Sequence, residues 1–327
     1  MIKFKNINMI IGHQKILDYL KKSATKDRVS HGYLFYGPEK IGKRKVAFEF
    51  AKILQCQDCQ FSCGVCKSCQ DIEVERHPDV AVIRADLDSR EIEISQIRNL
   101  RKNLSLSSHS GNYKIAIIDD AHNLNVEVAN ALLKTLEEPR GKTVLILASA
   151  FPGLLPKTII SRLQQIRFSF VSGPLMEEYL ERAGIDENQR QELLRISYGR
   201  PGILRDILAD LRKKDNYKSF MKGLAGLTNF DFNERFEYVK KISENRQDSI
   251  RFLEGLLILF RDIFLIKLGV DNFIINNFFG KDLAKIAENY SRNRLYKILK
   301  LARRLTEMIS RSNVNPRLCL EVLMLEL

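Results

Sequence analysis

The first part of the chain that could do chemistry is a glycine-containing loop. Gly37 and Gly42 are separated by four residues and followed by Lys43, which matches the G-x-x-x-x-G-K pattern of phosphate-binding loops. Between a strand and a helix, such a loop points backbone N–H groups at a phosphate, assisted by the helix N-terminus and the lysine. The next residue is Arg44, where a serine or threonine hydroxyl normally ligates Mg²⁺, and a guanidinium has no acceptor atom. The pattern predicts a loop of phosphate-binding ancestry without tight magnesium-nucleotide binding. The alternative is a glycine-containing turn that binds nothing.

A pair of carboxylates follows a second apolar run. Residues 115–118 are all apolar and end at Asp119 and Asp120. At the carboxyl end of a buried strand in an open parallel sheet, a carboxylate lies where ligands bind, and in P-loop enzymes it orients Mg²⁺. A glutamate would usually follow to polarise the attacking water, and Asp120 is one methylene shorter. Alone the pattern often marks only a strand end, but with the loop at Gly37 it indicates a degenerate nucleotide site.

A third candidate is a cysteine cluster: Cys56, Cys59, Cys63, Cys66 and Cys69. In a reducing cytoplasm a tight cluster indicates metal binding rather than disulfides. Four thiolates in a tetrahedral array form a closed structural Zn²⁺ site with no open position for catalysis. The last three cysteines are tightly spaced, so Cys56 or Cys59 supplies the fourth ligand and the other is spare. An iron–sulfur cluster and a zinc knuckle that grips nucleic acid are the alternatives.

Two further groups of side chains are less specific. Arg162 follows a serine shortly after a predicted strand, and it is either a solvated surface charge or an arginine supplied in trans to a neighbouring subunit's γ-phosphate. The histidines are scattered and form no nucleophile pair or metal motif, so we interpret them as structural or surface residues: His13, His31, His77, His109 and His122.

The apolar patterning of the first half predicts the elements that position these residues. Short continuous apolar runs indicate buried strands at residues 33–36, 80–83, 114–118 and 143–147. Helical spacing indicates helices over residues 43–54 and 126–138. Continuous Val/Ile/Leu strands separated by helices predict a parallel sheet covered on both faces. Beyond about residue 170 only helical patterns remain, and they cover residues 174–211, 248–268 and 295–309.

The overall composition is that of a folded protein with an anionic partner. The 327 residues carry 53 Lys and Arg against 40 Asp and Glu, a formal net charge of +13. This length predicts two or three domains, and the hydrophobic content of 45% excludes wholesale disorder and fibrous repeats. Bulk charge does not choose between DNA, RNA, nucleotides and an acidic protein surface. The most apolar run, residues 255–260, ends at Arg261 and Asp262, so we expect no membrane segment and a cytoplasmic protein.

Taken together, these stretches resemble the clamp-loader ATPase family of bacterial DNA polymerase III. The most specific segment is residues 129–139, with the sequence ANALLKTLEEP. The other segments that carry the resemblance are the cysteine cluster and residues 11–14, 30–43, 114–121 and 159–162. Within the family the chain resembles the non-hydrolysing delta-prime branch rather than the gamma/tau motors, because Arg44 replaces the hydroxyl and Asp120 the glutamate.

The resemblance implies an α/β P-loop domain of the RecA-like AAA+ type, followed by two helical domains. Residues 1–170 would form the nucleotide-binding-like domain, with a zinc module inserted at residues 56–69. Residues 171–210 would form a small helical lid, and residues 211–327 an all-α collar for oligomerisation.

The resemblance also assigns roles to single residues. Arg162 occupies the family's Ser-Arg-Cys motif, with Leu163 in place of the cysteine, and would complete the ATP site of an adjacent motor subunit. Arg205 lies in a stretch that resembles the motors' sensor-2 segment and favours some retained nucleotide binding. The degenerate nucleotide site would consist of Gly37, Gly42, Lys43, Asp119 and Arg205. The zinc ligands would be Cys56, Cys63, Cys66 and Cys69, with Cys59 as a substitute for Cys56.

The implied function is that of a non-hydrolysing structural subunit in the ring that opens the sliding clamp and loads it on primed DNA. Its partners would be the gamma/tau and delta subunits, with clamp and DNA reached through the assembled complex. Structural Zn²⁺ is the expected cofactor, tight ATP binding is not expected and Mg²⁺ is not expected. The chain would have no ATPase activity of its own while belonging to a polymerase holoenzyme. Two alternatives stay open: an active gamma/tau-like ATPase, and a zinc-containing nucleic-acid-binding protein.

Overall fold

The computed structural model describes residues 10–58, 61–85, 91–109, 112–311 and 314–327. The chain divides into two compact units, one containing Met1–Gly184 with Gly199–Gly202 and the other containing Ile185–Tyr198 with Ile203–Leu327. The predicted lid, residues 171–210, is therefore shared between the units, and the division into three domains stays a prediction. In the described residues no helix is long and apolar enough to cross a membrane.

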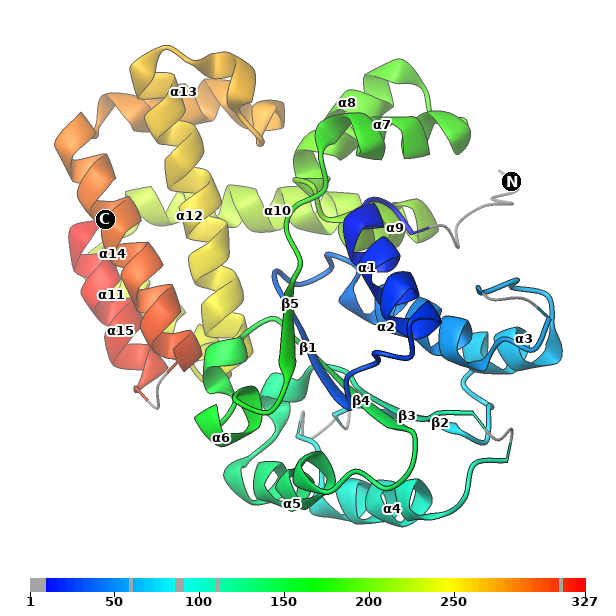
Figure 1. The fold of residues 1–327 in the computed structure, drawn as a ribbon. Coiled ribbons are helices and arrows are strands. Elements are labelled where there is room, and N and C mark those ends of the chain that lie inside the picture. The colour runs from blue at the N-terminus through cyan, green and yellow to red at the C-terminus, as the bar shows by residue number, and fades with distance from the viewer. Residues whose placement is uncertain (1–9, 59–60, 86–90, 110–111, 312–313) are drawn as a thin grey trace. The chain divides into compact units, whose positions relative to one another are not determined.

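The first unit is built on a five-stranded parallel sheet (Figure 1). The strand order is β2-β3-β4-β1-β5. The strands are β1 (Gly32–Tyr36), β2 (Val80–Ile83), β3 (Lys114–Ile118), β4 (Thr143–Ser149) and β5 (Gln164–Arg167). The first four correspond to the four predicted strands, so the expected parallel α/β fold is confirmed.

The strand β5 has no counterpart among the sequence-based predictions. It pairs with β1 at the edge of the sheet, where Tyr36 lies opposite Arg167. Its sequence is QQIR, and only Ile166 is buried. Because three of its four residues are exposed, β5 lacks the continuous apolar run that identifies the other strands.

Helices cover both faces of this sheet. Along β1, Phe35 belongs to the core on one face and Leu34 to the core on the other, as the two-residue period of a strand requires. The first face is covered by α1 (Gln14–Thr25) and α2 (Lys43–Gln55), with α3 (Lys67–Glu73) packed against α2. The second face is covered by α4 (Ile94–Ser105), α5 (Val126–Glu137) and the short α6 (Lys157–Ile160). The unit also contains α7 (Gly173–Arg182).

The second unit is helical in its described residues. Its helices are α8 (Glu187–Ser197), α9 (Pro201–Ala209, of which Pro201 and Gly202 belong to the first unit), α10 (Arg212–Gly226), α11 (Phe232–Ile242), α12 (Arg246–Leu268), α13 (Gly280–Glu288), α14 (Arg292–Arg311) and α15 (Pro316–Glu326). The long helix α12 packs along α14 and α13. The helices predicted over residues 248–268 and 295–309 are confirmed as α12 and α14.

Candidate nucleotide site and candidate metal centre

The loop that joins β1 to α2 follows the carboxyl end of a central strand, where ligands bind in open parallel sheets. Gly37 and Gly42 both have positive φ values, +150° and +110°, which favour glycine. A Cβ atom on Gly37 would also overlap the carbonyl oxygen of Phe168, just after β5. Both glycines of the predicted motif are thus required by the backbone path.

The amine of Lys43 is bonded to its own loop. Its Nζ donates hydrogen bonds of 2.8 Å to the carbonyl oxygens of both Gly37 and Pro38. The side chain is buried, and this burial lowers the pKa of the Lys43 amine to about 8, opposed by the charges of Asp120, Glu39 and Asp119. In this structure the amine therefore satisfies loop carbonyls, and a phosphate would have to compete with them.

The loop has a second restraint from the start of α9. The backbone N–H of Gly202 donates to the Lys40 carbonyl oxygen at 2.7 Å. A Cβ atom on Gly202 would lie 2.7 Å from that same oxygen, so a side chain cannot be added without moving the loop. The loop conformation is thus supported from outside as well as by Lys43.

Arg44 is the cationic partner of the carboxylates near the loop. Its Nη2 lies 2.6 Å from Glu75 Oε1, and its Nε lies 3.6 Å from Asp119 Oδ2. The guanidinium also lies over the Phe48 ring, 5.2 Å from the centroid. Burial and the charge of Asp120 raise the pKa of Asp119, and the charge of Arg44 opposes that rise. The carboxylate predicted to orient Mg²⁺ is therefore paired with a cation of the protein itself.

Two histidines belong to this region, although the sequence does not indicate it. His13 Nε2 is 2.9 Å from the Ile41 carbonyl oxygen, within the loop. His122 is buried against Phe151, and its Nδ1 has no hydrogen-bond partner in the described residues. Burial lowers the pKa of His122 to about 4, so the ring is neutral at pH 7. The only sequence signals were their positions, His13 just before α1 and His122 three residues after Asp119.

The structure brings together four of the five residues of the predicted nucleotide site: Gly37, Gly42, Lys43 and Asp119. Arg205 belongs to the other compact unit, and its role stays a prediction.

Arg162 lies near the amino ends of the strands, whereas the loop lies at their carboxyl ends. One residue, Leu163, separates Arg162 from the amino end of β5. The loop, in contrast, follows the carboxyl end of β1, which is parallel to β5. The two ends of the five-residue strand β1 are about 13 Å apart. The side chain of Arg162 is 37% exposed, and its Nη2 lies 2.6 Å from Glu137 Oε1.

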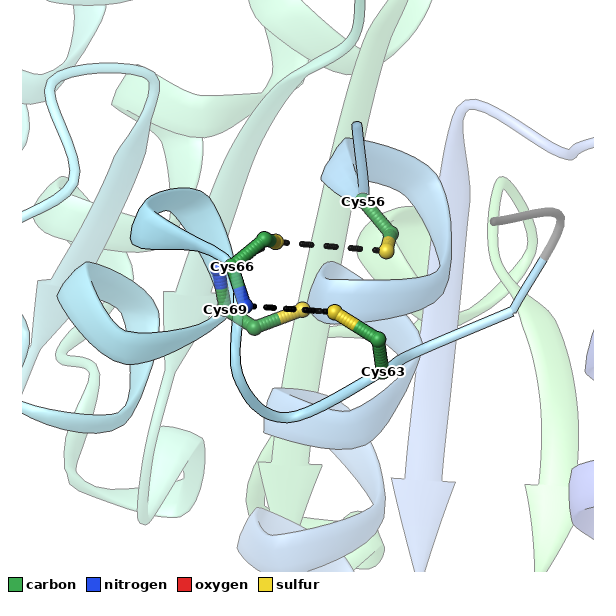
Figure 2. A group of neighbouring side chains, drawn as sticks. All are labelled: Cys56, Cys63, Cys66 and Cys69. Carbon is green, nitrogen blue, oxygen red and sulfur yellow. Dashed lines mark hydrogen bonds between the residues drawn. The ribbon is translucent and has the colours of Figure 1, made fainter. Parts of the chain in front are cut away.

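Four cysteines converge at the C-terminal end of α2 and around α3 (Figure 2). The Sγ atoms of Cys56 and Cys66 are 4.0 Å apart, as are those of Cys63 and Cys69, and all four lie within 4.8 Å of one another. Zn–S bonds of about 2.3 Å in a tetrahedron place the sulfurs about 3.8 Å apart. These four thiols could therefore hold a metal ion, and their geometry is compatible with zinc. Cys59 lies outside the described residues.

Backbone amides and burial prepare the same site. The N–H of Cys66 points at Cys63 Sγ (3.2 Å), and the N–H of Cys69 at Cys66 Sγ (3.4 Å). Such donors stabilise sulfur that carries negative charge. Burial raises the pKa of the Cys69 thiol to about 12, so a cation would have to displace that proton on binding. Between these cysteines, the Ser68 hydroxyl donates to the Gln55 carbonyl oxygen and ties α3 to α2.

A basic cavity lies between the C-terminal ends of α4 and α5. Its volume is about 370 Å³. The cationic residues of its lining, called the basic cavity residues below, are Arg98, Arg101, Lys102, Lys134 and Arg140. The lining has one acidic residue, Glu138. A cavity with this charge suits phosphate groups.

Comparisons with known proteins connect most of the chain to one family. A family model described as "DNA polymerase III, delta subunit" matches residues 12–172, and one for the C-terminal part of that subunit matches residues 212–327. The chain is 39% identical to the delta' subunit of DNA polymerase III from Pseudomonas aeruginosa over 176 residues, 53% of this chain and 54% of that protein. It is 26% identical to the Bacillus subtilis tau subunit over 340 residues, 96% of this chain and 60% of that protein.

The chain thus spans between about half and three fifths of the length of these two relatives. Among solved structures, a DNA polymerase III gamma subunit-related protein from Thermotoga maritima aligns with a TM-score of 0.39 and 20% identity, covering 94% of this chain and 97% of that one. Two family models and the curated relatives agree, and the chain therefore belongs to the DNA polymerase III clamp-loader family that contains the delta', gamma and tau subunits.

Proposed function

We propose that this chain is a delta'-type subunit that does not hydrolyse ATP and acts as a structural member of a clamp loader. In that role it would help a ring of subunits open the sliding clamp and place it on primed DNA in the cytoplasm. The family contains gamma and tau subunits as well as delta', so the choice between them rests on the loop. The single observation that carries it is the pairing of Arg44 with Asp119 and Glu75.

Charge and valence explain why that pairing opposes catalysis. Mg²⁺ bound to a nucleotide needs oxygen ligands, and Arg44 supplies hydrogen-bond donors only. A guanidinium next to Asp119 also repels a divalent cation and already neutralises the carboxylate that would attract one. Lys43 adds to this because its amine is bonded to the loop.

The second part of the proposal is that Arg162 acts in trans. Its side chain is partly exposed, and the residue lies at the amino ends of the strands, away from the β1–α2 loop of the same chain. A guanidinium offers several donors in a plane, which suits the oxygens of a γ-phosphate on a neighbouring gamma/tau subunit. A delta subunit would be a further member of the same ring.

The third part concerns the cofactor. Cys56, Cys63, Cys66 and Cys69 would hold one structural Zn²⁺, which would leave no open position for catalysis. When bound, the ion would crosslink the end of α2 to α3. Its contribution would be to folding, not to the chemistry of ATP.

The test compares ATP hydrolysis by the purified chain with hydrolysis by a complex reconstituted with the gamma/tau and delta subunits of the same organism. We expect no Mg²⁺-dependent hydrolysis by the chain alone. In the complex, Arg162→Ala should slow ATP turnover by a factor on the order of 10³, as trans arginines do in other P-loop systems.

Arg182→Ala is the matched control, because Arg182 is also exposed and paired with a glutamate, Glu178. Unchanged ATPase activity in the Arg162→Ala complex would refute the role in trans. Mg²⁺-dependent hydrolysis by the chain alone would instead support the second candidate, an active gamma/tau-like ATPase, which the sequence around Arg205 favours. For that activity, Lys43 would have to leave the loop carbonyls and Arg44 would have to leave Asp119.

A further inference from the structure

We propose that Glu137 is a positioning residue for Arg162: it holds the guanidinium in a fixed orientation on the protein surface before a neighbouring subunit binds. This inference rests on the proposed function of Arg162 in trans. It adds a second residue to that site, one whose side chain would touch no nucleotide.

Three contacts define the orientation of the guanidinium. Arg162 Nη2 lies 2.6 Å from the carboxylate of Glu137, the last residue of α5. Arg162 Nη1 donates to the Thr158 carbonyl oxygen at 2.8 Å and lies 3.4 Å from the Ser161 hydroxyl oxygen. A guanidinium has five N–H donors, so the Nε hydrogen and one on Nη2 stay available to a ligand.

The backbone that carries this pair is fixed by the packing of neighbouring side chains: Glu137 ends α5, and Arg162 lies in the short turn between α6 and β5. Leu136, next to Glu137, and Leu163, next to Arg162, are buried in the same hydrophobic core, as is Ile159 of α6. Both leucines lie close to β1: a Cβ atom on Gly32 would be 2.6 Å from Leu163 Cδ2 and 3.1 Å from Leu136 Cδ2. The carboxylate and the guanidinium thus extend from backbone whose neighbouring side chains are locked in the core, and such packing holds side chains close to one geometry.

The exposure of the pair indicates positioning rather than stabilisation. The Glu137 side chain is 49% exposed and the Arg162 side chain 37%. Ion pairs with this exposure contribute little to folding stability. They do restrict the many rotamers of an arginine, and a restrained guanidinium loses less freedom when it binds phosphate.

The experiment uses the reconstituted complex with Glu137→Gln, which keeps the shape of the side chain and removes its charge. We expect ATP turnover to fall about two- to fivefold, because the strength of an exposed ion pair limits the effect. Glu127→Gln is the matched control: Glu127 is exposed on the same helix and has no ion pair within the described residues. It should leave turnover unchanged.

The double variant separates positioning from a general structural effect. In an Arg162→Ala background, Glu137→Gln should cause no further loss, because there is no guanidinium left to hold. A further loss in that background would overturn the proposal, and so would wild-type turnover in Glu137→Gln alone. If Arg162→Ala itself has no effect, the role of Arg162 in trans fails and the positioning role fails with it.

Discussion

At the residue level, the loop combines a phosphate-binding backbone with an ion pair formed by the residue that follows its lysine. Arg44 places a positive charge beside Asp119 and Glu75. The surrounding backbone keeps the features of a phosphate-binding loop, including both glycines and the lysine. The site therefore keeps its architecture, while its electrostatic balance is satisfied from within.

His122 is buried, and its burial should make the stability of the protein depend on pH. Burial lowers the pKa of His122 to about 4 from an unfolded value near 6.5. The unfolded chain therefore takes up this proton first as the pH falls. The stability that depends on neutral His122 is complete above pH 6.5 and is lost progressively from pH 6.5 towards pH 4.

We predict that His122→Leu will make stability less dependent on pH. Between pH 7 and pH 5 the wild-type protein should lose on the order of 1–2 kcal/mol of unfolding free energy through this residue, and the variant should not. Urea unfolding at the two pH values measures the difference. An equally steep loss in both proteins would mean that the His122 ring is protonated as easily in the folded state as in the unfolded one.

At the scale of elements, the cysteine cluster explains how a very short helix is maintained. The helix α3 has seven residues, fewer than an isolated helix needs to be stable in water. Cys66 forms its N-cap, where the sulfur accepts from the N–H of Cys69, and Ser68 ties it to α2. A metal ion held by Cys56, Cys63, Cys66 and Cys69 would fix the first turn of α3 to the end of α2.

We predict one zinc ion per chain, and its loss in Cys56→Ser but not in Cys59→Ser. The reason is that the Cys56 sulfur lies within the tetrahedral cluster. Elemental analysis of the purified variants measures the metal content, with Cys319→Ser as a control for a buried cysteine far from the cluster in sequence. Zinc loss in Cys59→Ser with retention in Cys56→Ser would reverse the ligand assignment.

For the molecule as a whole, the net charge is +13, and the basic cavity residues form one local group of positive side chains within it. They lie at the C-terminal ends of α4 and α5 and beside the start of β4. A cluster of this kind attracts a phosphate backbone without reading its sequence.

We predict weak, salt-dependent DNA binding that depends on this cluster. Replacing Arg101 and Lys134 together by alanine should reduce the slope of log affinity against log salt by about two, one for each lost phosphate contact. Fluorescence anisotropy with duplex DNA at several salt concentrations measures the slope. Arg303→Ala, on an exposed face of α14, is the control. An unchanged slope in the double variant would exclude the cavity as a DNA contact, and tight binding by the lone chain would favour a free-standing nucleic-acid-binding protein.

Features that depend on neighbouring residues along the chain can be predicted from the amino-acid sequence. Continuous apolar runs identify β1, β2, β3 and β4, and in β3 and β4 the run reflects burial on both faces of the sheet. The spacing of Gly37, Gly42 and Lys43 identifies the loop, and the spacing of the cysteines identifies a metal cluster. Each of these signals lies within a segment short enough to be read without knowing the fold.

Contacts between side chains that are far apart in the sequence become visible only in the folded structure. Arg44 pairs with Glu75 and Asp119, and Arg162 pairs with Glu137. These partners lie far away in the sequence, and no local pattern connects them. The polar strand β5 exists because β1 offers it an edge to pair with, and the pKa of His122 is low because the core closes over the ring. Pairing and burial depend on packing between elements, and the spacing of residues within one element carries no record of it.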